Sequence, residues 1–71
     1  MEANYDRTWE YRFYDESGLI TAGDYPPGID GLDSDEQAWR AADLFKRENG
    51  IIVSRIERRK ANDTWENVPV L

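Results

Sequence analysis

The chain has 71 residues, a formal net charge of −6 at pH 7, and neither cysteine nor histidine. This length allows one domain near the lower limit for independent folding, and the missing residue types exclude disulfides, cysteine-based metal sites and histidine-activated nucleophiles. No apolar run is long enough to cross a membrane, and the N-terminus lacks the basic and apolar regions of a signal peptide. We therefore expect a cytoplasmic protein with one domain over residues 1–71, including tails at 1–6 and 69–71.

Residues 8–14 (TWEYRFY) alternate between two faces, and one face carries three aromatic side chains. These are Trp9, Tyr11 and Phe13. A period of two with many aromatic residues is typical of a strand with one buried face, and the segments DESG and LITAGDY then predict a turn and a returning strand. A four-residue loop would pair Phe13 with Ile20. The same register would pair Tyr11 with Ala22 on the core face.

The segment PPGIDGL, residues 26–32, lacks regular structure because its prolines remove backbone donors and its glycines loosen the chain. Ser34 then predicts an N-cap, and Gln37 three residues later completes the pattern of a capping box. The helix is predicted over 35–49, where an Asn–Gly pair supplies a left-handed stop. One apolar stripe of this helix is narrow enough to approach the aromatic residues of the first strand. It consists of Ala38, Ala41, Ala42 and Phe45, flanked by Trp39 and Leu44.

Residues 51–59 (IIVSRIERR) are β-branched at their start and alternate afterwards, which predicts a third strand. A turn at 60–63 leads to residues 64–68, which form a short fourth strand or a packed tail, and Pro69 denies it further ladder donors. A right-handed connection through the helix gives an antiparallel sheet in the order 2-1-3-4. The predicted fold class is therefore α+β, a two-layer ββαβ(β) sandwich with one helix on a three- or four-stranded antiparallel sheet. The other face of the sheet is left open.

Residues 24–39 hold five acidic side chains and no basic one. Four of the acidic residues lie close together in the sequence, as calcium ligands would. They are Asp30, Asp33, Asp35 and Glu36. However, their spacing is not that of a calcium-binding hand, and the helix dipole alone favours acidic residues in a first turn. We therefore expect a helix entrance, with no metal and no cofactor.

Two surfaces are candidates for binding a protein partner. The acidic residues around the helix start form a negative patch beside two aromatic residues predicted to be exposed, and amphipathic rings often anchor interfaces. This patch consists of Asp24, Asp30, Asp33, Asp35, Glu36, Asp43, Tyr25 and Trp39. Alternatively, Trp39 folds over the edge of the core. The second candidate is the open sheet face with the basic strand, to which we assign Tyr14, Tyr25, Arg55, Arg58 and Arg59.

An aromatic sheet with a basic strand is also a feature of proteins that stack single-stranded nucleic acid. However, the chain has no RNP-like glycine–aromatic motif, and its charge is unevenly spread. Residues 1–50 carry 12 acidic and 5 basic side chains, whereas residues 51–71 carry 3 and 4. Most of the surface therefore repels phosphates, and arginines on a strand commonly keep an open face soluble. We do not expect nucleic-acid binding.

Catalysis has little support in the sequence. The carboxylates of Asp15 and Glu16 are adjacent, but a one-helix chain of this length rarely encloses a pocket of several hundred Å³. The serines Ser17, Ser34 and Ser54 have no histidine to activate them. There is also no glycine-rich phosphate loop. We expect the protein not to be an enzyme.

Four segments of the chain together resemble short uncharacterised proteins of actinobacteria and their bacteriophages. These segments are WEYRFYDESG, SDEQAWRAA, SRIERR and WENV, and they span most of residues 8–68. What is shared is a spacing of aromatic, alanine and arginine positions, without catalytic residues. The resemblance implies a small accessory protein, often of phage origin, that acts by contacting host or phage proteins.

The sequence leaves two functions open. The first is a non-enzymatic protein-interaction module, which needs an apolar centre with a charged rim. The alternative is an acidic mimic that inhibits a DNA- or RNA-binding protein, which needs carboxylates in rows at phosphate-like spacing. Nine aromatic residues also exceed what so small a core can bury, which predicts association with a partner or a second copy. An isologous homodimer would set the basic strand 55–60 of one copy against the acidic surface 30–43 of the other.

Overall fold

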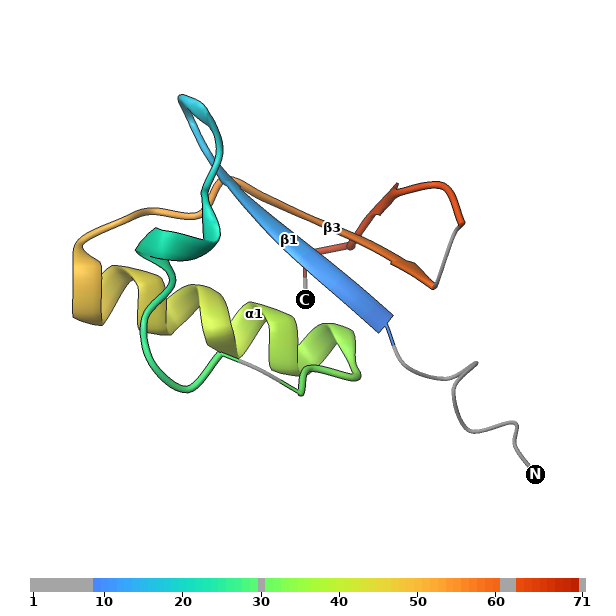
Figure 1. Ribbon diagram of the computed structural model, residues 1–71, viewed down its shortest axis with the longest axis horizontal. Helices are drawn as coiled ribbons and strands as arrows, with labels where there is room; N and C mark the ends of the chain where they lie inside the picture. The colour runs from blue at the N-terminus through green and yellow to red at the C-terminus, as the bar shows by residue number, and fades with distance from the viewer. Residues whose placement is uncertain (1–8, 30, 61–62, 71) are drawn as a thin grey trace.

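In the computed structural model, which describes residues 9–29, 31–60 and 63–70, four antiparallel strands form one sheet and one helix crosses it (Figure 1). The strands are β1 (Trp9–Asp15), β2 (Gly18–Leu19), β3 (Arg55–Lys60) and β4 (Glu66–Asn67). The helix is α1 (Asp35–Leu44), and it continues into a π-helical turn, η3 (Phe45–Asn49). The sheet order is β2-β1-β3-β4. The predicted α+β fold and its strand order are therefore confirmed.

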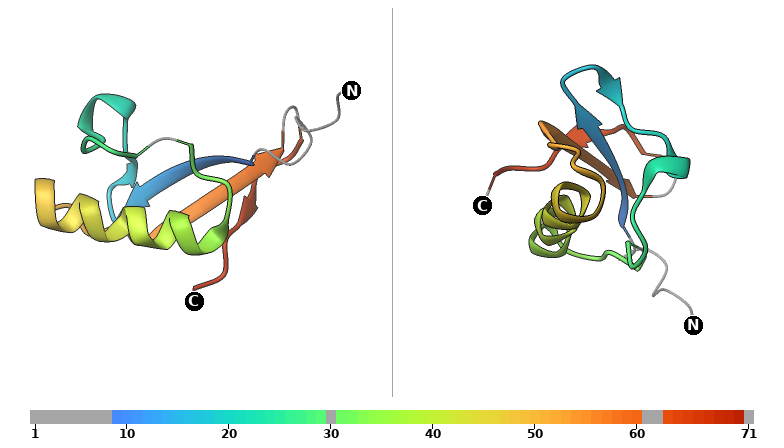
Figure 2. Two further views of the ribbon diagram at one scale, coloured as in Figure 1. Left: turned by 90° about the horizontal axis from the view of Figure 1, so that it is seen from below. Right: turned by 90° about the vertical axis from the view of Figure 1, so that its left-hand side faces the viewer.

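Helix α1 lies on one face of the sheet, and no other described element covers the opposite face (Figure 2). Phe13 of β1 lies opposite Ile56 of β3, and both side chains are buried under the helix. Successive residues of a strand point to opposite faces. The neighbours of Phe13 and Ile56 along their strands therefore point away from α1, toward the uncovered face.

The β1–β2 hairpin turns through two residues and is shorter than the sequence predicts. The Asp15 carboxylate accepts hydrogen bonds from the N–H groups of Ser17 (2.8 Å) and Gly18 (3.0 Å), and Gly18 has the positive φ of +131° that this turn requires. The Ile20 N–H donates to the Phe13 carbonyl at 2.9 Å, so the predicted register is correct.

The predicted continuation of the second strand to residue 25 is wrong. Beyond Ile20 the chain forms a 3₁₀ turn, η2 (Ala22–Asp24), so Ala22 does not pair with Tyr11. The turn directs Tyr25 back toward the core, where its ring stands edge-on to Phe13 at a centroid distance of 5.6 Å. Burying this ring replaces the ladder pairs that a longer strand would make.

The helix begins and ends where its capping residues predict. The Ser34 hydroxyl accepts a hydrogen bond from the Gln37 N–H at 3.2 Å, whereas the Gln37 side chain accepts from the Asp33 N–H at 2.9 Å. The reciprocal half of the capping box therefore reaches one residue further back than expected. At the other end Gly50 has a φ of +70° and donates its N–H to the Lys46 carbonyl. The predicted helix over 35–49 is confirmed, and its last turn is π-helical.

The core lies between the helix and the sheet and draws on every strand or its flank. Phe13, Phe45 and Ile56 are fully buried at its centre, and the Phe13 and Phe45 rings lie 4.9 Å apart. The buried hydrophobic residues of the core are Phe13, Ile20, Ala38, Ala41, Phe45, Ile56 and Val68. Three of the four predicted stripe residues of α1 and η3 belong to this set, and Ala42 packs against it. The small alanines let the aromatic side chains of β1 fill the space between the layers.

The third strand begins later than predicted, at Arg55 rather than at residue 51. Ser54 still donates its N–H to the Tyr14 carbonyl at 2.7 Å, but β1 ends at the next residue and offers no further pairs. Ile51 and Val53 pack against the core while the chain runs back from η3 to the sheet. The fourth strand is likewise limited to β4, and the Val68 N–H donates to the Ile56 carbonyl at 2.9 Å.

Candidate partner-binding site

The sheet face that α1 leaves uncovered carries arginine, glutamate and aromatic side chains in alternation. Cross-strand pairs of β1 and β3 supply six of its residues, and a tryptophan just before β4 supplies a seventh. We call this surface the open face; it consists of Glu10, Arg12, Tyr14, Arg55, Glu57, Arg59 and Trp65. Glu10 lies opposite Arg59, Arg12 opposite Glu57 and Tyr14 opposite Arg55.

Three guanidinium groups of the open face lie over aromatic rings. The Arg12 and Arg59 guanidinium carbons lie 4.0 Å and 4.5 Å from the Trp65 ring centroid, and the Arg55 carbon lies 3.9 Å from that of Tyr14. Such contacts contribute about 0.5–1 kcal/mol each at exposed sites. A stacked guanidinium keeps its N–H groups in a plane parallel to the ring, where they remain available to acceptors.

Glu57 organises the centre of the open face. Its carboxylate accepts hydrogen bonds from the Tyr14 hydroxyl at 2.7 Å and from the Arg12 Nε at 2.9 Å, while an Arg55 terminal nitrogen lies 3.6 Å away. The hydrogen bond from Tyr14 lowers the pKa of Glu57 below its ordinary value, and the hydrogen bond and charge of Arg12 and the charge of Arg55 act in the same direction. Glu57 therefore stays ionised and holds both side chains in place.

The open face has one more positive charge than negative charges. Its three arginines face two carboxylates, and Arg59 donates from Nε to the second of these, Glu10, at 2.7 Å. Arg55 is the least engaged arginine of the face, since half of its side chain is exposed and its carboxylate contact within the described residues is 3.6 Å long. In a chain with net charge −6, the open face is thus a local cationic surface.

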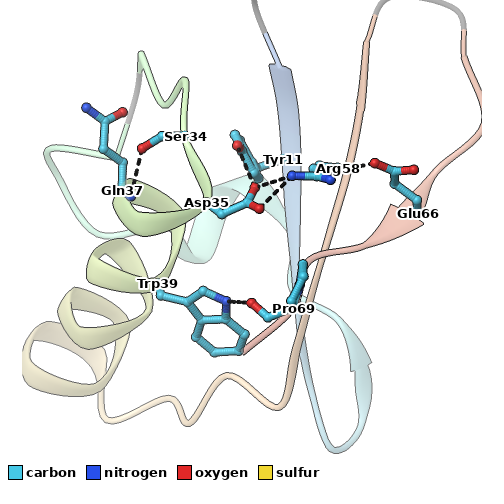
Figure 3. A network of polar contacts seen from close by, with 8 residues as sticks. All are labelled: Tyr11, Ser34, Asp35, Gln37, Trp39, Arg58, Glu66 and Pro69. Atoms are coloured by element: carbon cyan, nitrogen blue, oxygen red, sulfur yellow. Dashed lines mark hydrogen bonds and ion pairs between the residues drawn. The ribbon is translucent and has the colours of Figure 1, made fainter. Parts of the chain in front are cut away.

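The neighbouring strand residue Arg58 points the other way and is used within the fold (Figure 3). A terminal nitrogen of Arg58 donates to the Asp35 carboxylate at 2.6 Å, and its Nε donates to Glu66 at 2.8 Å. The Tyr11 hydroxyl also donates to Asp35, at 3.3 Å. Burial, together with the Asp35 charge, raises the pKa of Tyr11 to about 12.

This network corrects the predicted roles of Asp35 and Arg58. We predicted both as surface residues for a partner, but each has a side chain only 23% exposed and each is bonded to the other. Together they tie the first turn of α1 to β3. The sequence did not reveal this pair, because the two residues are 23 positions apart and their contact depends on the helix crossing the sheet.

The two aromatic residues predicted beside the acidic patch are placed differently by the structure. Tyr25 does not lie exposed or on the open face, since its ring packs edge-on against Phe13 and Phe45, and burial raises its pKa. Trp39 is half-buried, and its indole N–H donates to the Pro69 carbonyl at 2.8 Å (Figure 3). Trp39 therefore folds over the edge of the core, as the alternative interpretation predicted.

The remaining acidic candidates lie on the helix layer without an aromatic anchor. Asp33, Glu36 and Asp43 are exposed, and Glu36 forms an ion pair with Arg40 at 2.8 Å. Asp24 is exposed at η2, and Asp30 lies outside the described residues. In the described part of the chain no three acidic side chains are close enough to hold a metal ion.

Three of the predicted residues, Tyr14, Arg55 and Arg59, meet on the open face, whereas sequence reasoning missed its other four members: Glu10, Arg12, Glu57 and Trp65. Arg12 could have been found from the alternation of residues 8–14, which places it on the same face as Tyr14. Trp65 could not, because its position depends on the register of β4 against β3, where Asn67 lies opposite Glu57.

Cavities in the described structure are small. One of about 290 Å³ is lined by Trp39, Ile56 and Val68 among others, and a second of about 150 Å³ lies between β1 and the loop before α1. Pockets for drug-sized ligands typically measure about 300–1,000 Å³. The described helix is too short and too polar to span a membrane.

Comparison of the chain with protein-family models, curated proteins and solved structures found no match. The resemblance to small actinobacterial and phage proteins therefore stays a prediction.

Proposed function

We propose that the protein is a non-enzymatic interaction module that binds a partner protein through its open face. One observation carries this proposal: the uncovered side of the sheet gathers Tyr14, Trp65 and three arginines in one place. Tryptophan, tyrosine and arginine are the residues most enriched where truncation costs an interface most affinity. A phage accessory protein that occupies the surface of a host or phage protein would have this kind of face.

The alternative, an acidic mimic of nucleic acid, has less support in the geometry. Mimicry needs free carboxylates in rows, yet five of the described acidic residues form ion pairs with arginines. They are Glu10, Asp35, Glu36, Glu57 and Glu66. On the helix layer the exposed carboxylates also alternate with Arg40, Lys46 and Arg47 in the sequence.

The test compares three baits in affinity capture from the cells that express the protein. One bait is the wild type, one carries Leu19→Glu, and the control carries Arg40→Ala on the helix layer. Leu19 lies opposite Tyr14 at the margin of the open face and is 53% exposed, so the new negative charge opposes docking on this cationic face without removing a core contact. The expected result is a protein retained by the wild type and the control but lost by Leu19→Glu.

Two further observations decide the test. All three baits should show the same melting temperature, because both substituted side chains are exposed. A Trp65→Ala bait should lose the same protein as Leu19→Glu, since it removes the ring on which two arginines stack. A partner retained equally by every open-face variant and lost with Arg40→Ala would overturn the assignment of the binding surface.

A further inference from the structure

The three open-face arginines are spaced at a regular interval along the strand direction. Arg55 and Arg59 are four residues apart on β3, which separates them by about 13 Å at a rise of about 3.3 Å per residue. Arg12 lies on β1 opposite Glu57, which is midway between them. An extended peptide presents every second side chain to the same side, about 7 Å apart. Three such side chains therefore span the distance from Arg55 through Arg12 to Arg59.

These guanidinium groups keep donors for a ligand. Each arginine has five N–H groups. Within the described residues, Arg12 gives its Nε and one terminal nitrogen to Glu57 and keeps its other donors. Arg59 gives its Nε to Glu10, and Arg55 reaches a carboxylate only at 3.6 Å. Contact with the Trp65 and Tyr14 rings restrains the guanidinium groups before any partner arrives. Such preorganisation reduces the entropy that binding costs, and arginine pairs with carboxylates through two parallel hydrogen bonds.

From this geometry we infer that the partner's docking segment is an extended acidic peptide with carboxylates at alternate positions. This inference rests on the proposed function and names the chemistry of its partner. A carboxylate at the first, third and fifth positions would meet Arg55, Arg12 and Arg59 in turn. The excess positive charge of the open face is complementary to such a segment. The exposed carboxylates of the helix layer lie with α1 on the other side of the sheet, and salt weakens their effect on the open face.

A second copy of the chain fits the open face poorly. Two open faces in an isologous pair would set arginines against arginines. In the predicted homodimer, residues 55–60 of each copy would instead contact residues 30–43 of the other copy. That arrangement does not close, because the acidic residues lie with α1 on one side of the sheet and Arg55 and Arg59 lie on the other.

Nucleic acid also fits the open face poorly, because its aromatic rings are already covered. Bases bind an open sheet by stacking on its rings. Here the Trp65 and Tyr14 rings already carry guanidinium groups, which a base would have to displace.

The test is a titration followed by NMR, in which the three indole N–H signals report on three places. Trp65 lies on the open face, Trp9 lies under Arg58, and Trp39 is bonded to the Pro69 carbonyl. The probe is a peptide of alternating glutamate and threonine, and the matched peptide has glutamine in place of glutamate. We expect the acidic peptide to cause saturable shifts of the Trp65 and open-face arginine signals and to leave the Trp39 signal unchanged. The glutamine peptide should bind with an affinity at least about tenfold lower.

Variants and further probes make the outcome decisive. Arg55→Gln/Arg59→Gln should weaken binding of the acidic peptide about tenfold, whereas Arg40→Gln/Arg47→Gln on the helix layer should leave it unchanged. A peptide of the same composition with its glutamates in one block should bind more weakly than the alternating one. Tighter binding of a thymidine oligonucleotide, or Trp65 shifts that depend on protein concentration alone, would overturn the inference in favour of nucleic acid or a second copy.

The two proposals fail in distinguishable ways. If the acidic peptide does not shift Trp65 but Leu19→Glu still abolishes partner capture, the open face binds a partner of different chemistry and only the acidic preference is refuted. If capture is insensitive to Leu19→Glu, the proposed function itself is refuted.

Discussion

The two faces of the sheet use adjacent arginines of β3 in different ways. Arg58 points toward α1, where Asp35 and Glu66 both accept its hydrogen bonds and its side chain is mostly covered. Arg59 points to the open face, where its carboxylate contact within the described residues is to Glu10. The same residue type therefore closes the fold on one side and offers donors to a partner on the other. The helix above a strand, rather than the strand's own sequence, decides which role an arginine takes.

The largest expected difference in unfolding free energy is between truncations of an apolar residue on each face. Phe45 is fully buried on the helix side and contacts the Phe13 and Tyr25 rings, so Phe45→Ala should cost about 3–5 kcal/mol of unfolding free energy. Leu19→Ala on the open-face side removes a mostly exposed side chain and should cost well under about 1 kcal/mol. Equilibrium urea unfolding measures both. Equal midpoints would show that the core does not lie between α1 and the sheet.

A smaller difference in stability is expected between variants of the two adjacent arginines. Arg58→Gln leaves Asp35 without its ion-pair partner in a partly covered position and should cost about 1–2 kcal/mol. Arg59→Gln affects an ion pair with Glu10 that is largely solvated, and should change stability by less than about 0.5 kcal/mol. The comparison uses urea midpoints at one pH and salt concentration. A larger loss in Arg59→Gln than in Arg58→Gln would contradict the assignment of structural and partner-binding roles.

Low pH should destabilise the protein by protonating Glu57 on the open face. Its lowered pKa means that the unfolded chain binds a proton more readily than the folded protein does. The resulting stabilisation is complete above the ordinary pKa of 4.5 and is lost as pH falls through the lower folded value. Glu57→Gln should therefore flatten the fall of the melting temperature below about pH 4.5, and the exposed control Glu48→Gln should not. If the melting temperature of Glu48→Gln falls as little with pH as that of Glu57→Gln, the acid sensitivity comes from net charge and not from Glu57.

The smallest expected effect is that of calcium on stability, at the acidic start of α1 on the helix-covered side of the sheet. Asp35 is already bonded to Arg58, and Asp33 uses its backbone N–H to cap through Gln37. Millimolar calcium should therefore shift the melting temperature no more than matched ionic strength does. Calorimetric titration is the check. A saturable calcium isotherm that Asp33→Asn abolishes would show that these carboxylates form a metal site.

Local signals in the sequence were sufficient for the elements and their order. The alternation of residues 8–14, the Ser34 cap and the Asn49–Gly50 stop each act over a few residues, so they predict β1 and α1 without knowledge of the rest. The lengths of β2 and β3 were less predictable. A strand lasts only as long as its neighbour offers a ladder partner, and this depends on where the other strand turns away.

What the sequence by itself determined is therefore the α+β fold, its strand order and an uncovered sheet face. Tertiary structure alone decided that Tyr25 enters the core, that Asp35 binds Arg58, and that Trp65 joins Arg12 on the open face. The physical reason is distance along the chain. Each of these contacts joins residues from different elements, and its energy depends on burial and pairing that exist only after the helix has packed on the sheet.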